Sequence, residues 1–79
     1  MKIRRIHWSN AAYATRRVGQ AEIAFVLLQP GTKFRRNLPG RSATHIAVGR
    51  TQYGRRVTVA FVYVAESRAA IPITAWESR

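Results

Sequence analysis

Three arginines, Arg50, Arg55 and Arg56, surround one short segment in the middle of the chain. A guanidinium group holds its N–H donors in a planar fork that matches the oxygens of a phosphate, so this cluster predicts a phosphate-bearing partner. His45 precedes the cluster and is the one group of the region with a pKa near neutrality, so it could give or take a proton. Tyr53 lies between the arginines and could stack on a base or hydrogen-bond to a phosphate.

Each of these residues also has a plainer interpretation. A single histidine among apolar neighbours more often packs or hydrogen-bonds within a fold, and a tyrosine in a turn is often only a solvated tip. Ala43 and Ala47 alternate with His45, which places its side chain on the face opposite Ile46 and Val48. Whether His45 can give a proton to a ligand or take one from it therefore depends on whether that face of the sheet is open to solvent.

The element that must position these residues is a β-hairpin over residues 44–64. Two runs rich in β-branched and aromatic residues flank a segment with Gly49 and Gly54 near its ends, which is the pattern of a hairpin. Alternate residues of the second run point to opposite faces, and both sets are largely apolar. One set is Val57, Val59, Phe61 and Tyr63; the other is Thr58, Ala60, Val62 and Val64. We therefore expect a central strand that is covered on both sides.

Before the hairpin, the pattern predicts two helices. Residues 3–8 form a short strand or an extended lead-in, and Ser9 or Asn10 can cap a helix over 11–17 that Gly19 ends. Residues 20–28 predict a second helix, since Ile23, Val26 and Leu27 share one face. The alternative for this continuous apolar run is a strand.

The remaining segments predict strands. Residues 33–37, which include Arg35 and Arg36, indicate a charged edge strand, and 38–42 a turn. Residues 69–76 predict the last strand, with no ladder bond on the amide side of Pro72. The fold class is therefore α+β over a single domain, residues 1–79, in which two N-terminal helices pack on a three- to four-stranded antiparallel meander.

The overall charge sharpens the expectation of a polyanionic partner. Lysine and arginine number 14 against 3 acidic residues, which gives a net charge of +11, and most of the cations are arginine. Such an excess predicts a nucleic acid or an acidic protein as partner. The plainer alternative is a solubilising surface.

Other classes of function are disfavoured by composition. The chain has no cysteine and two histidines, so no disulfide, metal site or other cofactor is expected. No apolar run approaches the ~20 residues of a membrane span and no signal peptide is evident, so we expect a soluble, cytoplasmic protein. Trp8 and Trp76 are expected to be core or interface aromatics.

The second half of the chain resembles the BrnT-like toxins of the wider RelE/ParE-like class from bacterial toxin–antitoxin pairs. The likeness lies in Gly49-Arg50-Thr51, Gly54-Arg55, the apolar strand that follows, and Ile71-Pro72-Ile73-Thr74-Ala75. It covers residues 44–75 well and 8–30 in outline. The chain departs from the family pattern at Arg17-Val18-Gly19, which keeps only the glycine of a His-Gly pair, at Trp76, which replaces an arginine, and in lacking the terminal helix that often follows.

This resemblance implies a metal-independent endoribonuclease that an acidic antitoxin neutralises. Such chemistry needs an acid or base near the ribose and cations around the phosphorane. On this hypothesis Arg55, Arg50 and His45 are the catalytic residues. The residues expected to bind RNA are Arg56, Tyr53, Arg35 and Arg36.

Two alternatives to the enzyme stay open. One is a non-catalytic nucleic-acid-binding module that uses the same arginines on phosphates. The other is a degenerate toxin-like interaction domain, because the wide apolar surface of residues 20–28 would need cover from a partner protein or from a second copy in a homo-oligomer.

Overall fold

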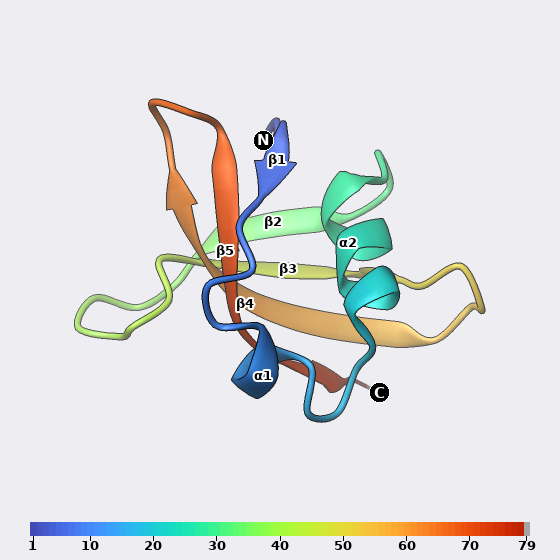
Figure 1. Cartoon of the computed structure of the whole chain (residues 1–79). Coiled ribbons are helices and arrows are strands. Elements are labelled where there is room, and N and C mark those ends of the chain that lie inside the picture. The colour runs from blue at the N-terminus through green and yellow to red at the C-terminus, as the bar shows by residue number, and fades with distance from the viewer. Residues whose placement is uncertain (79) are drawn as a thin grey trace.

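Five strands form one mixed sheet in the order β1–β5–β4–β3–β2, with two helices beside it (Figure 1). The structure is a computed structural model and describes residues 1–78. In chain order the elements are β1 (Arg5–Ile6), α1 (Ala11–Ala14), α2 (Gln20–Leu28), β2 (Lys33–Arg36), β3 (His45–Arg50), β4 (Arg56–Val64) and β5 (Ala69–Glu77).

The α+β class and the antiparallel meander of β2 to β5 are confirmed. The predicted number and direction of strands were wrong, because β1 adds a fifth strand that runs parallel to β5. This strand pairs residues 5–6 with residues 69–70, and a pairing between segments so far apart in sequence cannot be predicted from local sequence patterns.

Pro72 explains why β1 is only two residues long. The amide of His7 donates to the carbonyl of Ala70 at 2.9 Å. In a parallel ladder the next bond would run from the amide of residue 72 back to β1, and proline has no amide hydrogen. The chain therefore leaves the sheet after His7, and α1 takes the place beside the rest of β5.

The first helix ends earlier than predicted. It stops at Ala14, where the last turn tightens: the amide of Arg16 donates to the carbonyl of Tyr13, three residues back, at 3.3 Å. The amide and the hydroxyl of Thr15 both donate to the carbonyl of Ala11, at 2.9 and 2.7 Å. Asn10 occupies the N-cap position, but its side chain donates to the carbonyl of Ile73 instead of capping the helix. Gly19 is the N-cap of α2, not the C′ residue of α1, and its amide donates to Glu22 at 3.4 Å.

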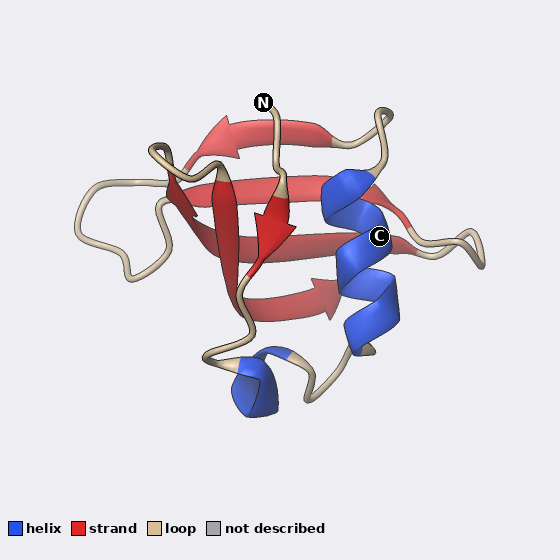
Figure 2. Ribbon diagram, turned by 45° about the horizontal axis from the view of Figure 1, so that its top comes forward, coloured by secondary structure: helices blue, strands red, loops and turns tan. Residues whose placement is uncertain are grey.

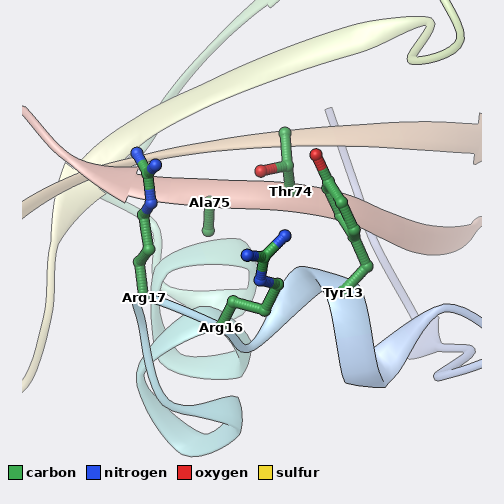
Figure 3. A pocket seen from close by; sticks show the side chains of 5 residues that line it. All are labelled: Tyr13, Arg16, Arg17, Thr74 and Ala75. Carbon is green, nitrogen blue, oxygen red and sulfur yellow. The ribbon is translucent and has the colours of Figure 1, made fainter.

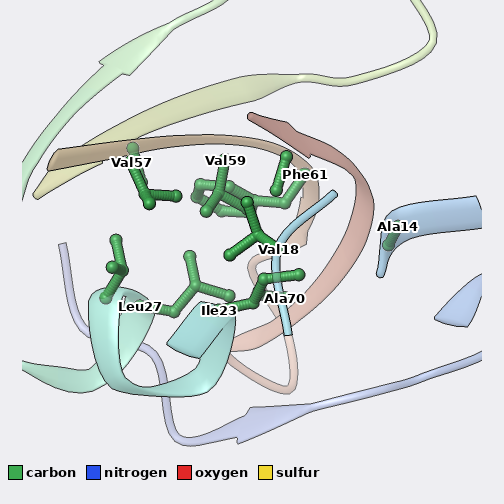
Figure 4. Packing of buried hydrophobic residues seen from close by; sticks show 11 residues of the cluster. Ala14, Val18, Ile23, Leu27, Val57, Val59, Phe61 and Ala70 are labelled. Atoms are coloured by element: carbon green, nitrogen blue, oxygen red, sulfur yellow. The ribbon is translucent and has the colours of Figure 1, made fainter. Parts of the chain in front are cut away.

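The second helix is confirmed and forms the main core with the sheet (Figure 4). Its buried residues Ile23, Val26 and Leu27 pack in one cluster with Val59 and Phe61 of β4. Figures 1 and 2 show α2 lying across one face of the sheet. Neither helix of residues 1–78 is long and apolar enough to span a membrane.

We call the face under α2 the covered face and its opposite the open face. Cross-strand partners in register share a face, so the register assigns each side chain. The covered face carries Phe34, Arg36, His45, Ala47, Val57, Val59, Phe61 and Ala75. The open face carries Lys33, Arg35, Ile46, Val48, Arg50, Arg56, Thr58, Ala60, Thr74 and Trp76. A second, small cluster of Ala43, Ile46 and Ala60 lies on the open face, and no helix residue belongs to it.

Candidate nucleic-acid interface

The hairpin tip is built to hold its arginines in fixed positions. The amide of Thr51 donates to the carbonyl of Arg55 at 2.8 Å, and the amide of Gly54 donates back to the carbonyl of Thr51 at 3.0 Å. Gly54 has a φ of +83°, which a side chain would strain. The buried hydroxyl of Thr51 accepts from the amides of Tyr53 and Arg55. The backbone positions from which the arginine side chains extend are therefore set by the fold.

Arg55 points to the covered side, where two carboxylates hold it. Its guanidinium lies 3.2 Å from Glu22 of α2 and 3.5 Å from Glu77 of β5. The Glu22 side chain is only 12% exposed, so this ion pair joins the helix to the hairpin from a partly buried position. The charge of Arg55 is already offset within the fold, while a catalytic role for it stays a prediction.

Arg50 and Arg56 are cross-strand partners and lie together at one end of the open face. Both are exposed. One guanidinium nitrogen of Arg50 donates to the carbonyl of Gly54 at 2.8 Å, which orients the side chain. A carbonyl leaves the positive charge in place, and the other N–H donors of the fork remain for a ligand.

His45 lies at the opposite end of β3, on the covered face. Its ring stacks on Phe61 with centroids 5.8 Å apart and meets Tyr63 edge-on at 5.7 Å. Its Nδ1 is 2.8 Å from the hydroxyl of Thr44. Burial, and after it the positive charge of Arg36, lowers the pKa of His45 below its ordinary value. This shift favours the neutral form of the imidazole.

The structure thus does not bring the three predicted catalytic residues together. His45 and Arg50 are the first and last residues of β3, so their backbones lie roughly 17 Å apart at about 3.4 Å per residue. They also point to opposite faces, and Arg55 faces a pair of carboxylates. One phosphate cannot contact all three.

The residues predicted to bind RNA are divided between the two faces. Arg35 and Arg56 lie on the open face, whereas Arg36 lies on the covered face beside His45. Tyr53 is 76% exposed at the hairpin tip. Only Arg35 and Arg56 therefore share a surface with Arg50.

That surface is arranged in rows across the sheet. The first row is Arg50–Arg56, the second Lys33–Val48–Thr58–Trp76, and the third Arg35–Ile46–Ala60–Thr74. The first row, at the hairpin tip, consists of two arginines. The second and third rows begin on β2 with Lys33 and Arg35, and the second row ends on β5 with Trp76. Rows follow one another at about 7 Å, which is twice the rise of a strand residue.

Two hollows lie along these rows. The first, of about 410 Å³, is lined by residues that include Lys33, Val48, Arg50 and Arg56. The second, which we call the face hollow, measures about 330 Å³. The residues around it include Arg35, Leu38, Arg41, Ile46, Ala60, Ile73, Thr74 and Trp76. Small residues such as Ala60 lower the floor, while long cationic and aromatic side chains form the rim.

None of the three acidic side chains of the chain lines either hollow. Glu22 and Glu77 are paired with Arg55, and Glu66 lies in the turn between β4 and β5. Five cations therefore line the two hollows, and no acidic side chain does. They are Lys33, Arg35, Arg41, Arg50 and Arg56.

Sequence reasoning missed Lys33, Arg41 and Trp76 as members of the site. Trp76 was expected to be a core or interface aromatic; it is 37% exposed on the open face, so it is not in the core, and the interface alternative stays a prediction. The signal that could have found it is the strand register: Trp76 pairs with Thr58, which pairs with Val48 and so with Lys33.

Comparison of the chain with protein-family models, with curated proteins and with solved structures finds no match. The class of protein is therefore defined by the fold and this surface alone. It is an α+β domain with helices on one sheet face and a cationic, partly aromatic surface on the other.

Proposed function

We propose that this protein binds single-stranded RNA on the open face of its sheet. The observation that carries the proposal is the pair of hollows, which are lined by five cations and by none of the three acidic side chains, with Ile46, Ala60 and Ile73 among the apolar residues of the face hollow. Lysine and arginine side chains bind phosphates, and the salt dependence of such binding counts the contacts. The net charge of +11 brings a polyanion to the molecule from any direction, and the open face gives it a place to bind.

Trp76 favours a single strand over a duplex. Its ring is 37% exposed at the rim of the face hollow, with Arg35 and Arg41 among the other residues of that hollow. Stacking on an aromatic side chain contributes about 1–3 kcal/mol per base and requires an unpaired base. A strand that places a base on Trp76 can contact these arginines with its phosphates.

A fluorescence titration tests the proposal. Trp8 and Trp76 are the two tryptophans, so a Trp8→Phe variant leaves Trp76 as the only indole while keeping an aromatic ring against the covered-face core. Adding a single-stranded oligoribonucleotide at low salt should quench the Trp76 emission, and the matching duplex should bind without that quenching. Absence of binding at low salt, or equal quenching by the duplex, would contradict the proposal.

Cleavage of the bound RNA, as the toxin resemblance implies, is a second candidate function. The observation in its favour is an imidazole beside a cation, because His45 and Arg36 are cross-strand partners. The lowered pKa of His45 favours the neutral form. A neutral imidazole can act as a base, and a neighbouring guanidinium can hold the phosphate. This assignment replaces the trio with Arg50 and Arg55 by a pair on the covered face. We place this activity in the cytoplasm and propose an acidic antitoxin protein as its regulator.

Cleavage and binding are separable by variants. His45→Gln should abolish cleavage of a labelled RNA and leave its affinity for the open face unchanged, whereas Trp76→Ala should weaken binding. Intact RNA after prolonged incubation with the wild-type protein would exclude the ribonuclease and leave the binding proposal standing.

A further inference from the structure

A small hollow lies between α1, the segment that links α1 to α2, and the edge of β5 (Figure 3). Five residues line it: Tyr13, Arg16, Arg17, Thr74 and Ala75. Its volume is about 130 Å³. Because a water molecule occupies roughly 30 Å³ of liquid, the hollow has space for about four such groups, the scale of one phosphate. We call it the edge hollow.

The residues around the edge hollow are suited to a doubly charged phosphate. Arg16 and Arg17 supply two guanidinium groups, and Tyr13 and Thr74 supply hydroxyl groups. Within residues 1–78 neither arginine forms an ion pair, in contrast to Arg55. A phosphate monoester carries about 1.5 to 2 negative charges near pH 7, more than the single charge of an internal diester. Two uncompensated cations therefore favour the monoester.

The linker that carries these arginines is held in place at both ends. Ala14 and Val18 are each 1% exposed and belong to the covered-face core. The amide of Arg16 donates to the carbonyl of Tyr13 at 3.3 Å, and the guanidinium of Arg16 lies 5.4 Å from the centroid of the Tyr13 ring. Figure 3 shows the side chains of Arg16 and Tyr13 reaching toward β5 on the side of Thr74. The donors are thus oriented before a ligand arrives.

The edge hollow continues the RNA surface around β5. Thr74 lines both the edge hollow and the face hollow. We infer that the edge hollow binds the terminal phosphate monoester of a strand whose body lies on the open face. This inference rests on the proposed RNA binding and adds to it the class of substrate, namely RNA with a phosphorylated end.

Three oligoribonucleotides of one sequence test the inference. One carries a 5′-phosphate, one a 3′-phosphate and one only hydroxyl ends, and their affinities are compared by fluorescence anisotropy. One phosphorylated form should bind about tenfold tighter than the hydroxyl form, the size expected of a charge-assisted hydrogen bond. The stronger of the two identifies which end enters the edge hollow.

A double variant, Arg16→Gln with Arg17→Gln, should abolish that preference and leave the affinity of the hydroxyl form within about twofold. The matched control is Lys2→Gln with Arg4→Gln, which removes the same charge from exposed positions that line neither the edge hollow nor the face hollow. It should keep the preference. Equal affinities of the three RNAs for the wild type would overturn the inference without affecting the proposed function.

A titration with inorganic phosphate distinguishes failure of this inference from failure of the proposed RNA binding. In ¹⁵N-labelled protein, saturable shifts of the amide signals of residues 13–18 and 73–75 should occur in the wild type and disappear in the double variant. Absence of these shifts would also overturn the inference. Phosphate binding without binding of any RNA would overturn the proposed function and the assignment to a strand end together.

Discussion

The salt dependence of binding gives a quantitative test of the open face. Its five cations, Lys33, Arg35, Arg41, Arg50 and Arg56, each contact at most about one phosphate. For a single strand each contact contributes about 0.7 to the slope of log affinity against log salt, so five predict a slope of about −3.5. Between about 50 and about 200 mM salt the affinity should then fall roughly 100-fold.

Replacing Arg35 and Arg41 by glutamine removes two of these contacts. The slope should then become about −2.1, and the same change of salt should reduce the affinity only about 20-fold. Both residues are exposed and border the face hollow, so the variant should fold normally. The assay is fluorescence anisotropy with an oligoribonucleotide that has hydroxyl ends, which keeps the edge hollow out of the measurement.

The control is the double variant Lys2→Gln with Arg4→Gln, which lowers the net charge by the same amount. It should keep a slope near −3.5, because its charges lie off the open face. If both variants lost the same part of the slope, binding would depend on total charge alone, and the reasoning from the rows of the sheet would be refuted.

Three further predictions concern the fold and its ion pairs. Gly49→Ala should lower the free energy of unfolding by about 1–3 kcal/mol, measured by thermal denaturation, because the added methyl would overlap the side chain of Thr32. Arg55→Gln should cost about 1 kcal/mol of stability by leaving the partly buried Glu22 without its cation, and should reduce RNA affinity no more than a variant off the open face. His45→Phe should flatten the pH dependence of stability: since burial and a nearby cation lower the folded pKa, the wild type loses stability as pH falls through the ordinary histidine value, and the variant does not.

Each of these predictions has a control or a result that would contradict it. Gly31→Ala adds the same methyl group 3.7 Å from its nearest neighbour and should be nearly neutral. A loss of RNA affinity in the Arg55 variant much larger than in Arg4→Gln would return Arg55 to the binding site. For His45, the stability of the wild type and of His45→Phe is compared between pH 5 and 8, the range over which unperturbed histidine changes charge. Equal dependence of stability on pH in the two proteins would show that His45 does not contribute to it.

The sequence was most informative where a pattern is local. Residues 20–28 show helical periodicity and residues 56–64 are apolar on both faces of a strand, and the helix and the strand formed over these ranges. The expectation that this strand would be covered on both sides was wrong, because the helices pack on one face only. The end of α1 was misplaced because the last turn tightens at Arg16, whose amide bonds to the carbonyl of Tyr13 three residues back. The strand β1 was uncertain because its pairing depends on residues at the other end of the chain.

The site was harder to predict than the fold, because it depends on which face each side chain takes. Arg50 and Arg56 were placed together correctly, but the neighbouring Arg55 points the other way to meet Glu22, 33 residues away in sequence. Trp76 entered the site only through the register of three strand pairs. Residue types indicated a phosphate-binding site, whereas the pairing of distant strands determined which of these residues lie on the same surface.

The parallel pairing of β1 with β5 has a consequence for synthesis of the chain on the ribosome. Arg5 and Ile6 can complete the sheet only when Ala69 and Ala70 have left the exit tunnel, and the side chain of Asn10 must likewise find a carbonyl 63 residues further on. Contacts this distant in sequence slow folding. The pairing of β1 should therefore form on the nascent chain only after residues 69–70 have left the exit tunnel, and the complete sheet should form only after that point.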